Sequence, residues 1–364
     1  MTKRETVIAF TGGGTGGHIY PGLAVASYIK KRMQCRIFWI GSNQGIDKSI
    51  IENAGMDFYG IPAGKLRRRF TFKNAADTLN IAAGFFAARK ILRREKPALL
   101  FSKGGFVSVP PAAAAASLGI PVFSHESDLT PGLATKINLR FSKKLFVPYD
   151  ESLRFYPQKI RAKIEVTGNP VRPGFSEADG SKGREFLNIN EGDPILLVLG
   201  GSLGSLEINR LVQESLSDLI RHFVVVHQCG SGHGEIPSPG SRYKPYAYFN
   251  DELPHVIAAA DLVICRGGAG TIWECAALKK PMIIIPLRGS GTRGDQVENA
   301  RVFENAGAAI NLSDDLTSEK LSFLVCSLAA DKKRRDAMAA AGTIKTGAAE
   351  YIAEKIIQAG GEHE

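Results

Sequence analysis

The sequence predicts an α/β protein made of two Rossmann-like, doubly wound domains that face a cleft. Two observations support this class. Short apolar strands alternate with helical stretches, and the order strand, glycine-rich loop, helix occurs twice. A length of 364 residues is enough for two or three domains. Ligands of such sheets bind at the carboxyl ends of the strands, so the residues that directly follow the strands are the first candidates for a ligand site.

The first series of elements opens with Val7–Phe10, which predicts a short buried strand. This strand enters the glycine-rich stretch 12–17, and a helix is expected from Pro21, which suits a first helical turn, to about Lys31. Further strands are expected at Arg36–Ile40, Ala98–Ser102, Pro121–Ser124, Lys144–Val147 and Ile164–Thr167. Helical stretches lie between them, so a parallel sheet with helices on both faces is predicted.

The second series begins at Pro194–Leu199, a buried strand that leads into the loop Gly200–Gly204 and a helix from about Ser205 to Ser217. Further strands are expected at Phe223–Gln228, Asp261–Cys265 and Pro281–Pro286. Between the two series, Gly168–Pro173 has the glycine and prolines of a linker. We therefore expect a first domain over residues 1–168 and a second over residues 169–344.

Charge is unevenly distributed along the chain, whose formal net charge is +10. Residues 1–170 contain 26 Lys and Arg against 11 Asp and Glu, whereas residues 171–364 contain 20 against 25. The basic half is predicted to face something anionic: nucleic acid, lipid headgroups or a phosphate-bearing substrate. A merely solvated basic face is the alternative.

Cysteine usage and hydropathy exclude several classes of protein. The five cysteines are scattered and form no Cys-x-x-Cys, which fits a reducing compartment and offers no zinc site. Three prolines interrupt the longest apolar stretch, Val107–Phe123, so a transmembrane helix is not expected there. The apolar patch Val7–Phe10 is too short for a signal peptide, and no export is expected.

The segment 65–103 combines eleven Lys and Arg with two acids and several phenylalanines, and a helix is expected from about Lys73 to Glu95. Basic side chains beside aromatic ones predict a patch for an anionic membrane surface. An ordinary helix whose apolar face belongs to the core is the alternative. The predicted patch residues are Arg67, Arg68, Arg69, Phe70, Phe72, Phe85, Phe86, Arg89 and Lys90.

The first glycine-rich loop, 12–17, formally satisfies G-x-G-x-x-G, which alone is weak evidence for a dinucleotide site. The expected second strand ends in Ile40-Gly41-Ser42, without the acid that would hold a ribose, which argues against an NAD-linked oxidoreductase. The backbone amides of the loop can still bind phosphate. His18 follows at once, and a neutral imidazole there can accept a proton from a hydroxyl, although a structural role is the alternative.

Polar residues also follow the later strands. His125–Asp128 is expected to line the cleft, unless these residues only form a turn in which Asp128 caps the next helix. Glu274 is suited to both hydroxyls of a ribose, but Thr271 and Glu274 also have the spacing of a capping box. Asp295 and Gln296 can bind sugar hydroxyls. The chain has no Asp-x-Asp, so no metal is expected, and helix N-termini are expected to hold a diphosphate.

Five motifs in order resemble the MurG family of GT-B glycosyltransferases (family 28). They are Gly13–Ala26, Thr167–Arg172, Gly200–Gly204, Arg266–Glu274 and Asp295–Ala300, and the resemblance covers about residues 5–355. It implies inverting, metal-independent transfer of N-acetylglucosamine from UDP-N-acetylglucosamine to undecaprenyl-diphospho-N-acetylmuramoyl-pentapeptide, which converts lipid I to lipid II in peptidoglycan synthesis. The alternative is a GT-B enzyme with another lipid or small-molecule acceptor. A binder of anionic surfaces without catalysis would leave the glycine loops unexplained.

The resemblance also implies roles for single residues. His18 would be the base, with Glu126 as the alternative. The donor-binding residues would be Thr15, Gly16, Gly17, Arg172, Ser202, Asn250, Arg266, Gly268, Ala269, Thr271, Glu274, Asp295 and Gln296. The acceptor-binding residues would be Gly13, Gly14, His18, Glu126 and Asp128. Many family members have His-Glu-Gln-Asn where this chain has His125–Asp128, which leaves the side-chain roles at 127 and 128 open.

The resemblance finally implies the partners and the location. These are UDP-N-acetylglucosamine, lipid I and an anionic membrane surface, with no cofactor and no nucleic acid. The protein would sit peripherally on the cytoplasmic face of the cell membrane. A C-terminal helix within about residues 345–364 would pack back onto the first domain.

Overall fold

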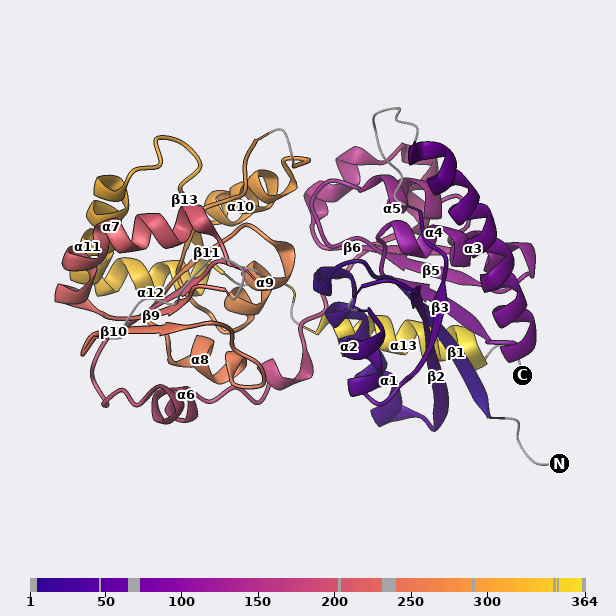
Figure 1. The fold of residues 1–364 in the computed structure, drawn as a ribbon, viewed down its shortest axis with the longest axis horizontal. Coiled ribbons are helices and arrows are strands. Elements are labelled where there is room, and N and C mark those ends of the chain that lie inside the picture. Colours follow the sequence, from indigo (N-terminus) through magenta and orange to yellow (C-terminus); the bar gives the residue numbers. More distant parts are fainter. Residues whose placement is uncertain are drawn as a thin grey trace. The chain divides into compact units, whose positions relative to one another are not determined.

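The computed structural model describes residues 5–45, 47–64, 73–201, 204–230, 240–289, 292–342, 345 and 347–361. The chain forms two compact units (Figure 1). Unit 1 comprises Met1–Arg172 and Lys345–Glu364, and unit 2 comprises Pro173–Ile344. The division therefore falls at the end of the expected linker, four residues after the boundary expected from the sequence. Each unit contains one parallel sheet, which confirms the predicted fold class.

Unit 1 is built on a seven-stranded parallel sheet with the order β3-β2-β1-β4-β5-β6-β7. Its strands are β1 (Thr6–Thr11), β2 (Cys35–Ser42), β3 (Asp57–Ile61), β4 (Leu99–Ser102), β5 (Val122–His125), β6 (Lys144–Val147) and β7 (Ile164–Val166). The strand order reverses between β1 and β4, which pair directly, with Thr11 opposite Ser102. The carboxyl ends of these two strands therefore form the switch point at which doubly wound sheets bind ligands.

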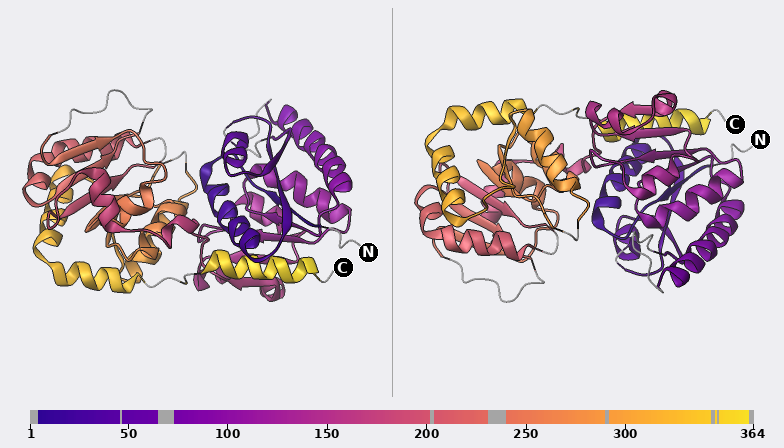
Figure 2. Two further views of the ribbon diagram at one scale, coloured as in Figure 1. Left: turned by 90° about the horizontal axis from the view of Figure 1, so that it is seen from below. Right: turned by 90° about the horizontal axis from the view of Figure 1, so that it is seen from above.

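Helices cover both faces of this sheet. They are α1 (Tyr20–Arg32), α2 (Asp47–Asn53), α3 (Lys73–Glu95), α4 (Val109–Ser117), α5 (Leu133–Asn138) and α13 (Ala348–Gly361), with 3-10 turns at Gly16–His18 (η1), Phe106–Ser108 (η2), Asp150–Phe155 (η3) and Gln158–Lys163 (η4). On one face Trp39 and Phe10 pack with Ile29 of α1 and Ile352 of α13. The C-terminal helix α13 thus returns to unit 1, where it lies beside α1 (Figure 2). On the other face Phe38 belongs to the core layer formed by α3 and α4.

Unit 2 repeats the plan with six parallel strands in the order β10-β9-β8-β11-β12-β13. The strands are β8 (Ile195–Leu199), β9 (Val224–Gln228), β10 (Tyr243–Tyr246), β11 (Leu262–Cys265), β12 (Met282–Ile284) and β13 (Ala309–Asn311). The helices are η5 (Pro173–Phe175), α6 (Gly180–Leu187), α7 (Leu206–His222), α8 (Leu253–Ala259), α9 (Ala269–Ala277), α10 (Asp295–Asn305), α11 (Ser318–Ala330) and α12 (Lys332–Ala341). Its switch point lies between β8 and β11.

Three strands were not predicted from the sequence, and all three lie at sheet edges: β3, β10 and β13. An edge strand needs no continuous apolar run, because one side of it has no neighbouring strand. Accordingly, β3 starts with an exposed aspartate, and β10 has the sequence Tyr-Lys-Pro-Tyr. The buried central strands, in contrast, lie within a residue or two of their expected positions.

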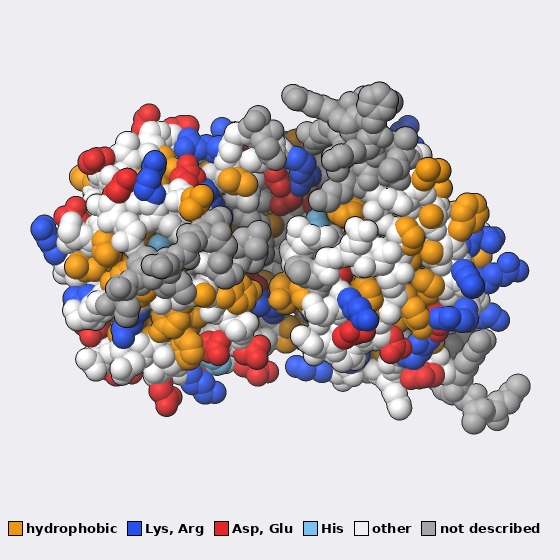
Figure 3. Space-filling view, viewed as in Figure 1, with side chains coloured by type: hydrophobic (Ala, Val, Ile, Leu, Met, Phe, Trp, Pro, Cys, Tyr) orange, Lys and Arg blue, Asp and Glu red, His pale blue; other side chains and the backbone are white. Residues whose placement is uncertain are grey.

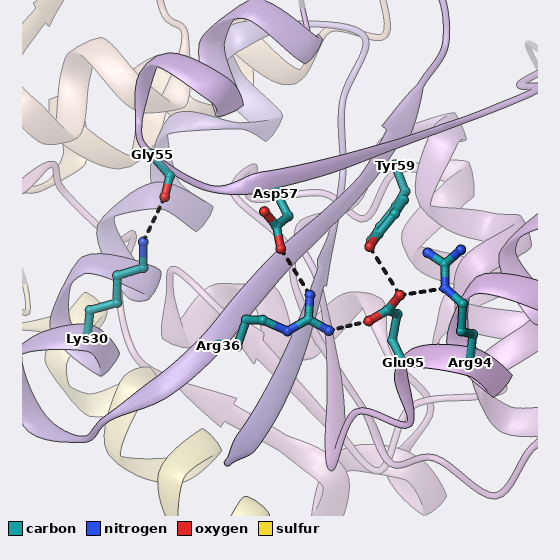
Figure 4. Close-up of polar contacts among 7 residues, drawn as sticks. All are labelled: Lys30, Arg36, Gly55, Asp57, Tyr59, Arg94 and Glu95. Atoms are coloured by element: carbon teal, nitrogen blue, oxygen red, sulfur yellow. Dashed lines mark hydrogen bonds and ion pairs between the residues drawn. The ribbon is translucent and has the colours of Figure 1, made fainter.

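A polar cluster connects the end of α3 to strands β2 and β3 (Figure 4). The Arg36 guanidinium forms an ion pair with Asp57 at 2.9 Å and a further ion pair with Glu95. Glu95 also accepts hydrogen bonds from Tyr59 Oη at 3.1 Å and from Arg94 Nε at 2.7 Å. Burial alone would raise the pKa of Glu95, but these partners lower it. The cluster therefore holds the C-terminal end of α3 firmly against the sheet.

Candidate active site

The loop that follows β1 is held in place by two buried side chains. The Asp47 carboxylate accepts the Gly14 N–H at 2.9 and 3.2 Å and the Ser42 N–H at 3.1 Å. Trp39 donates its indole N–H to the carbonyl of Gly12 at 2.9 Å. A Cβ at Gly13 would lie 2.0 Å from Asp47 Oδ2, so only glycine fits against this carboxylate. The glycine-rich loop that was predicted to bind phosphate is therefore held in place by Asp47 and Trp39.

His18 ends the short η1 helix, whose N-cap is Thr15 and which contains Gly16 and Gly17. His18 Nδ1 lies 3.3 Å from the carbonyl oxygen of Lys103, which follows β4. Since a carbonyl only accepts hydrogen bonds, this contact requires the proton on Nδ1, and the neutral ring then carries its lone pair on Nε2. A Cβ at Gly105, where φ is 77°, would lie 3.0 Å from His18 Cδ2, so glycine there leaves space for the ring.

Glu126, which follows β5, is buried and serves as the centre of a loop. Its Oε1 accepts the N–H groups of Ser127 at 2.9 Å and Asp128 at 3.2 Å, and its Oε2 accepts Gly132 N–H at 2.9 Å and Thr135 Oγ1 at 2.6 Å. Four donors therefore hold this carboxylate in one position. Capping of the next helix by Asp128 does not occur, because α5 has Gly132 as its N-cap and no side-chain cap.

Lys103 and His125 are buried ionisable residues at the same strand ends. Lys103 is 1 % exposed and donates from Nζ to Ser127 Oγ at 2.5 Å. Burial lowers the pKa of Lys103 to about 8, against the carboxylates of Glu126 and Asp128, which raise it. Burial, followed by the charge of Lys103, lowers the pKa of His125 well below its usual value, so His125 is neutral. Lys103 was counted only within the basic segment 65–103 and was not predicted as a site residue, because a lone lysine beside glycines forms no recognised motif.

In unit 2, Arg266 supports the glycine-rich loop that follows β8. Its guanidinium donates to Ser205 Oγ at 2.6 Å, to Glu207 at 2.7 Å and to the carbonyl of Ile285 at 3.1 Å. These contacts join the ends of β8, β11 and β12. Gln228 was not predicted, yet it donates to the Gly201 carbonyl at 3.0 Å and accepts from the N–H of Phe249 at 3.2 Å. Ser202 lies outside the described residues.

The helix α9 begins at the switch point of unit 2, with Gly268 as its N-cap and Ala269 as its first residue. Thr271 and Glu274 both lie inside this helix, so the capping-box alternative is wrong. The loop before α9 is packed tightly, because a Cβ at Gly267 would lie 2.4 Å from the carbonyl oxygen of Gln296. Asn299 of α10, which was not predicted as a site residue, donates to the Gly267 carbonyl at 3.3 Å.

The remaining residues that were predicted to bind the donor substrate contact partners within their own unit. Gln296 Oε1 accepts the N–H of Leu287 at 2.9 Å, and Asp295 pairs with Arg293 at 2.9 Å. The N–H of Asn250 donates to Glu252 at 3.1 Å, so this amide is already engaged. Arg172 is the last residue of the first part of unit 1 and lies over the ring of Tyr20, 5.0 Å from its centroid.

The predicted membrane patch is described only in part, since Arg67, Arg68, Arg69, Phe70 and Phe72 lie outside the described residues. Phe85 packs against the core of unit 1, whereas Phe86 is 69 % exposed. A hollow on α3 is lined by Phe86, Arg89, Lys90, Arg93 and Arg94. Hydrophobic and basic side chains gather along this edge of unit 1 (Figure 3). Among the described helices, none has both the length and the apolar character needed to cross a bilayer.

In the described part of the chain, no group of three or more His, Cys, Asp or Glu side chains is arranged to hold a metal ion. The polar groups at both switch points are instead backbone amides, side-chain hydroxyls, side-chain amides and the few charged residues named above. Such groups are suited to bind phosphate oxygens and sugar hydroxyls.

The comparisons with known proteins all point to one class of enzyme, the glycosyltransferases. Residues 8–147 match the glycosyltransferase family 28 N-terminal domain, and residues 195–355 match the glycosyltransferase family 28 C-terminal domain. A protein of Treponema denticola is 47 % identical over 85 % of this chain and 84 % of its own length. A protein of Shouchella clausii is 43 % identical over 96 % of this chain and 98 % of its own length. Both are named UDP-N-acetylglucosamine--N-acetylmuramyl-(pentapeptide) pyrophosphoryl-undecaprenol N-acetylglucosamine transferase.

Solved structures are similar in fold. The crystal structure of MurG from Acinetobacter baumannii superposes with a TM-score of 0.72 at 22 % identity and covers 97 % of this chain and 99 % of its own. The glycosyltransferase of kitacinnamycin superposes with a TM-score of 0.73 at 16 % identity, over 98 % of this chain and 100 % of its own. At such low identity these structures establish the fold alone.

Proposed function

We propose, from the premise that the chain belongs to glycosyltransferase family 28, that it transfers N-acetylglucosamine from UDP-N-acetylglucosamine to undecaprenyl-diphospho-N-acetylmuramoyl-pentapeptide. This is the reaction that converts lipid I to lipid II. The observation that carries the proposal is the position of His18, which lies on a supported glycine loop at the switch point of unit 1 with its Nδ1 3.3 Å from the Lys103 carbonyl oxygen. The close relatives supply the identity of the substrates.

In the proposed reaction His18 accepts a proton from the acceptor's sugar hydroxyl through Nε2. The hydroxyl oxygen attacks C1 of the donor sugar from the face opposite UDP, and UDP departs, so that the configuration at C1 is inverted. Glu126 is the weaker candidate for the base, because four hydrogen bonds already hold its carboxylate in a structural role. The exposed glycine-loop residues Gly14 and Thr15 offer the acceptor a close approach to the backbone.

The donor is proposed to bind unit 2. The amides of the loop after β8 and the N-terminus of α9 favour a diphosphate and stabilise the charge that develops on departing UDP. Glu274 would accept the ribose hydroxyls, while Gln296 and Asp295 would bind the sugar. No metal is needed in this scheme, because backbone amides and helix dipoles supply the positive potential.

Calorimetric titration with UDP-N-acetylglucosamine, with and without EDTA, tests the donor site. Binding should be unaffected by EDTA, and Glu274→Ala should weaken it at least about tenfold, since even one hydrogen bond to a charged group contributes about 1.5–3 kcal/mol. Glu214→Ala, which removes an exposed carboxylate from α7 of the same unit, is the matched control and should bind like the wild type. Failure of the wild type to bind any uridine nucleotide would refute the proposal. Transfer to a different acceptor only would favour the alternative GT-B activity.

We further propose that the α3 face holds the protein on an anionic membrane, peripherally and on the cytoplasmic side where the nucleotide-linked donor is found. Cosedimentation with vesicles containing phosphatidylglycerol should show binding that vesicles of phosphatidylcholine do not support. The triple variant R89E/K90E/R93E should bind at least about a hundredfold more weakly, at about 1 kcal/mol per basic residue near the surface. The triple variant K332E/K333E/R334E on α12 makes the same change in charge on exposed residues of unit 2. Equal losses in both variants would contradict a specific role for α3.

A further inference from the structure

Gln228 is the last residue of β9, and its side chain is almost fully buried. Its Nε2 donates to the Gly201 carbonyl at 3.0 Å, and its Oε1 accepts the N–H of Phe249 at 3.2 Å. Gly201 lies in the loop after β8, and Phe249 lies in the segment after β10, so the two partners follow the two strands that pair with β9. One side-chain amide therefore joins the two loops, and we call its pair of hydrogen bonds the Gln228 tether.

The Phe249 end of the tether is fixed by packing. The Phe249 side chain is 1 % exposed, and its ring centroid lies 4.8 Å from that of Tyr246 and 6.2 Å from that of Phe186. Phe249 and Tyr246 both lie at the carboxyl end of β10. The backbone N–H that reaches Gln228 is therefore held against the body of unit 2.

The Gly201 end of the tether depends on hydrogen bonds instead. Gly201 has a φ of 95°, and a Cβ added to it would meet no atom within 4 Å, so side-chain packing does not position this peptide. Its carbonyl accepts the N–H of Gly204 at 3.1 Å, a contact within the same loop, and the Gln228 amide, which comes from outside the loop. Gln228 thus transmits the position of the packed segment after β10 to the loop after β8.

The proposed donor complex gives these two loops different parts of one ligand. The diphosphate is proposed to lie at the switch point between β8 and β11, and the sugar at the start of α10, which follows β12. Because β9 and β10 lie on the other side of the switch point, the nucleobase is left for the end of the sheet that they form. Phosphate and nucleoside would then meet the two loops that Gln228 joins.

We infer that Gln228 is a positioning residue that sets the spacing between the phosphate-binding loop and the nucleoside-binding segment, so that UDP occupies both at once. It need not touch the ligand. Two subsites bind a linked ligand more tightly than its parts only where the geometry lets both be engaged together. Loops that are already held in the binding arrangement also avoid the cost of ordering on association. The inference rests on the proposed function, because it takes the donor to be a uridine diphosphate sugar.

Inhibition of transfer by UDP and by uridine, each in competition with the donor, tests the inference in the full chain. Gln228→Met keeps the length of the side chain and removes both hydrogen bonds of the tether, so the inhibition constant of UDP should rise about tenfold. The constant of uridine, which engages only one of the two loops, should change less than about twofold. The KM for the acceptor should not change. Gln213→Met is the matched control: it removes a hydrogen bond of 2.7 Å to Tyr243 Oη, at the opposite end of β10, and should leave both constants unchanged.

Two results would overturn the inference. One is an unchanged inhibition constant of UDP in Gln228→Met, and the other is an equal loss for UDP and uridine, which would mean that Gln228 supports the nucleoside segment alone. If Gln228→Met does not fold, Gln228→Asn decides in the same way, since its amide is one methylene too short to reach both loops. A wild type that transfers nothing would remove the proposed function and the inference together. A wild type that transfers normally, with no effect of either Gln228 variant on UDP, would remove the inference alone.

Discussion

Replacing His18 with alanine is expected to lower kcat for transfer by about two to four orders of magnitude, the usual contribution of general base catalysis. The affinity for UDP-N-acetylglucosamine should change little, because His18 itself is proposed to act on the acceptor, whereas Glu274, Gln296 and Asp295 of unit 2 are proposed to bind the ribose and the sugar. The contact of Nδ1 with the Lys103 carbonyl orients the ring, and Nε2 is the proposed proton acceptor, so the substitution should act on the chemical step. Single-turnover transfer and calorimetry, measured on the same preparation, check the two parts.

The pH dependence of the His18 variant provides a second readout. In the wild type, kcat should fall at acidic pH as the imidazole becomes protonated and can no longer accept the proton of the hydroxyl. This acidic limb should be missing in His18→Ala. Glu126→Gln is the informative comparison: an amide cannot accept four hydrogen bonds, so this variant should lose thermal stability and retain the acidic limb. Loss of the limb in Glu126→Gln, with the limb intact in His18→Ala, would assign the base to Glu126.

Much of the fold is predictable from the sequence because its central strands are buried on both faces. Strands such as β8 and β11 consist of apolar residues alone, and both are followed by glycine-rich turns. Among the edge strands β7 was predicted, but β3, β10 and β13 were not; β3 starts with an exposed aspartate, and β10 contains a proline. Their pairing depends on neighbouring strands that are distant in sequence, and a local pattern contains no such information.

The residues of the candidate site also form two groups, those that were predicted from the sequence and those that were not. His18, Glu126 and Glu274 were predicted because each follows or lies close to a glycine-rich turn or a strand end. The residues that support them were not predicted: Asp47 holds the first glycine loop, and Gln228 joins two loops of unit 2. A supporting residue acts through one contact at long sequence separation, and its type varies with the local geometry. Only the three-dimensional structure identifies it.

The supporting role of Asp47 leads to an expected loss of both stability and activity on its removal. Asp47 is fully buried, and its carboxylate is the acceptor for the amides of Gly14 and Ser42. Asp47→Ala would leave these two donors without an acceptor, at about 1–3 kcal/mol for each unsatisfied group, so the free energy of unfolding of unit 1 should fall by roughly 2–6 kcal/mol. Asp47→Asn retains one acceptor oxygen but turns an NH2 group toward an amide, and should fall between the wild type and Asp47→Ala.

The two tryptophans allow this loss to be measured in one unit. In a Trp273→Phe background Trp39 is the only tryptophan, and its indole donates to the same glycine loop. Its fluorescence during urea unfolding therefore reports on unit 1 and on the loop itself. Asp57→Ala, which removes an exposed carboxylate from its pair with Arg36, is the matched control and should cost less than about 1 kcal/mol.

Activity should follow the geometry of the loop as well as its stability. Without Asp47 the Gly14 amide loses its orientation, and His18 lies only four residues further along the same loop. A displacement of about 1 Å in catalytic geometry can cost on the order of a hundredfold in rate, so Asp47→Ala should lose transfer activity even at temperatures where it remains folded. Native activity in a folded Asp47→Ala protein would show that the loop keeps its shape unaided, and the anchoring role would then be wrong.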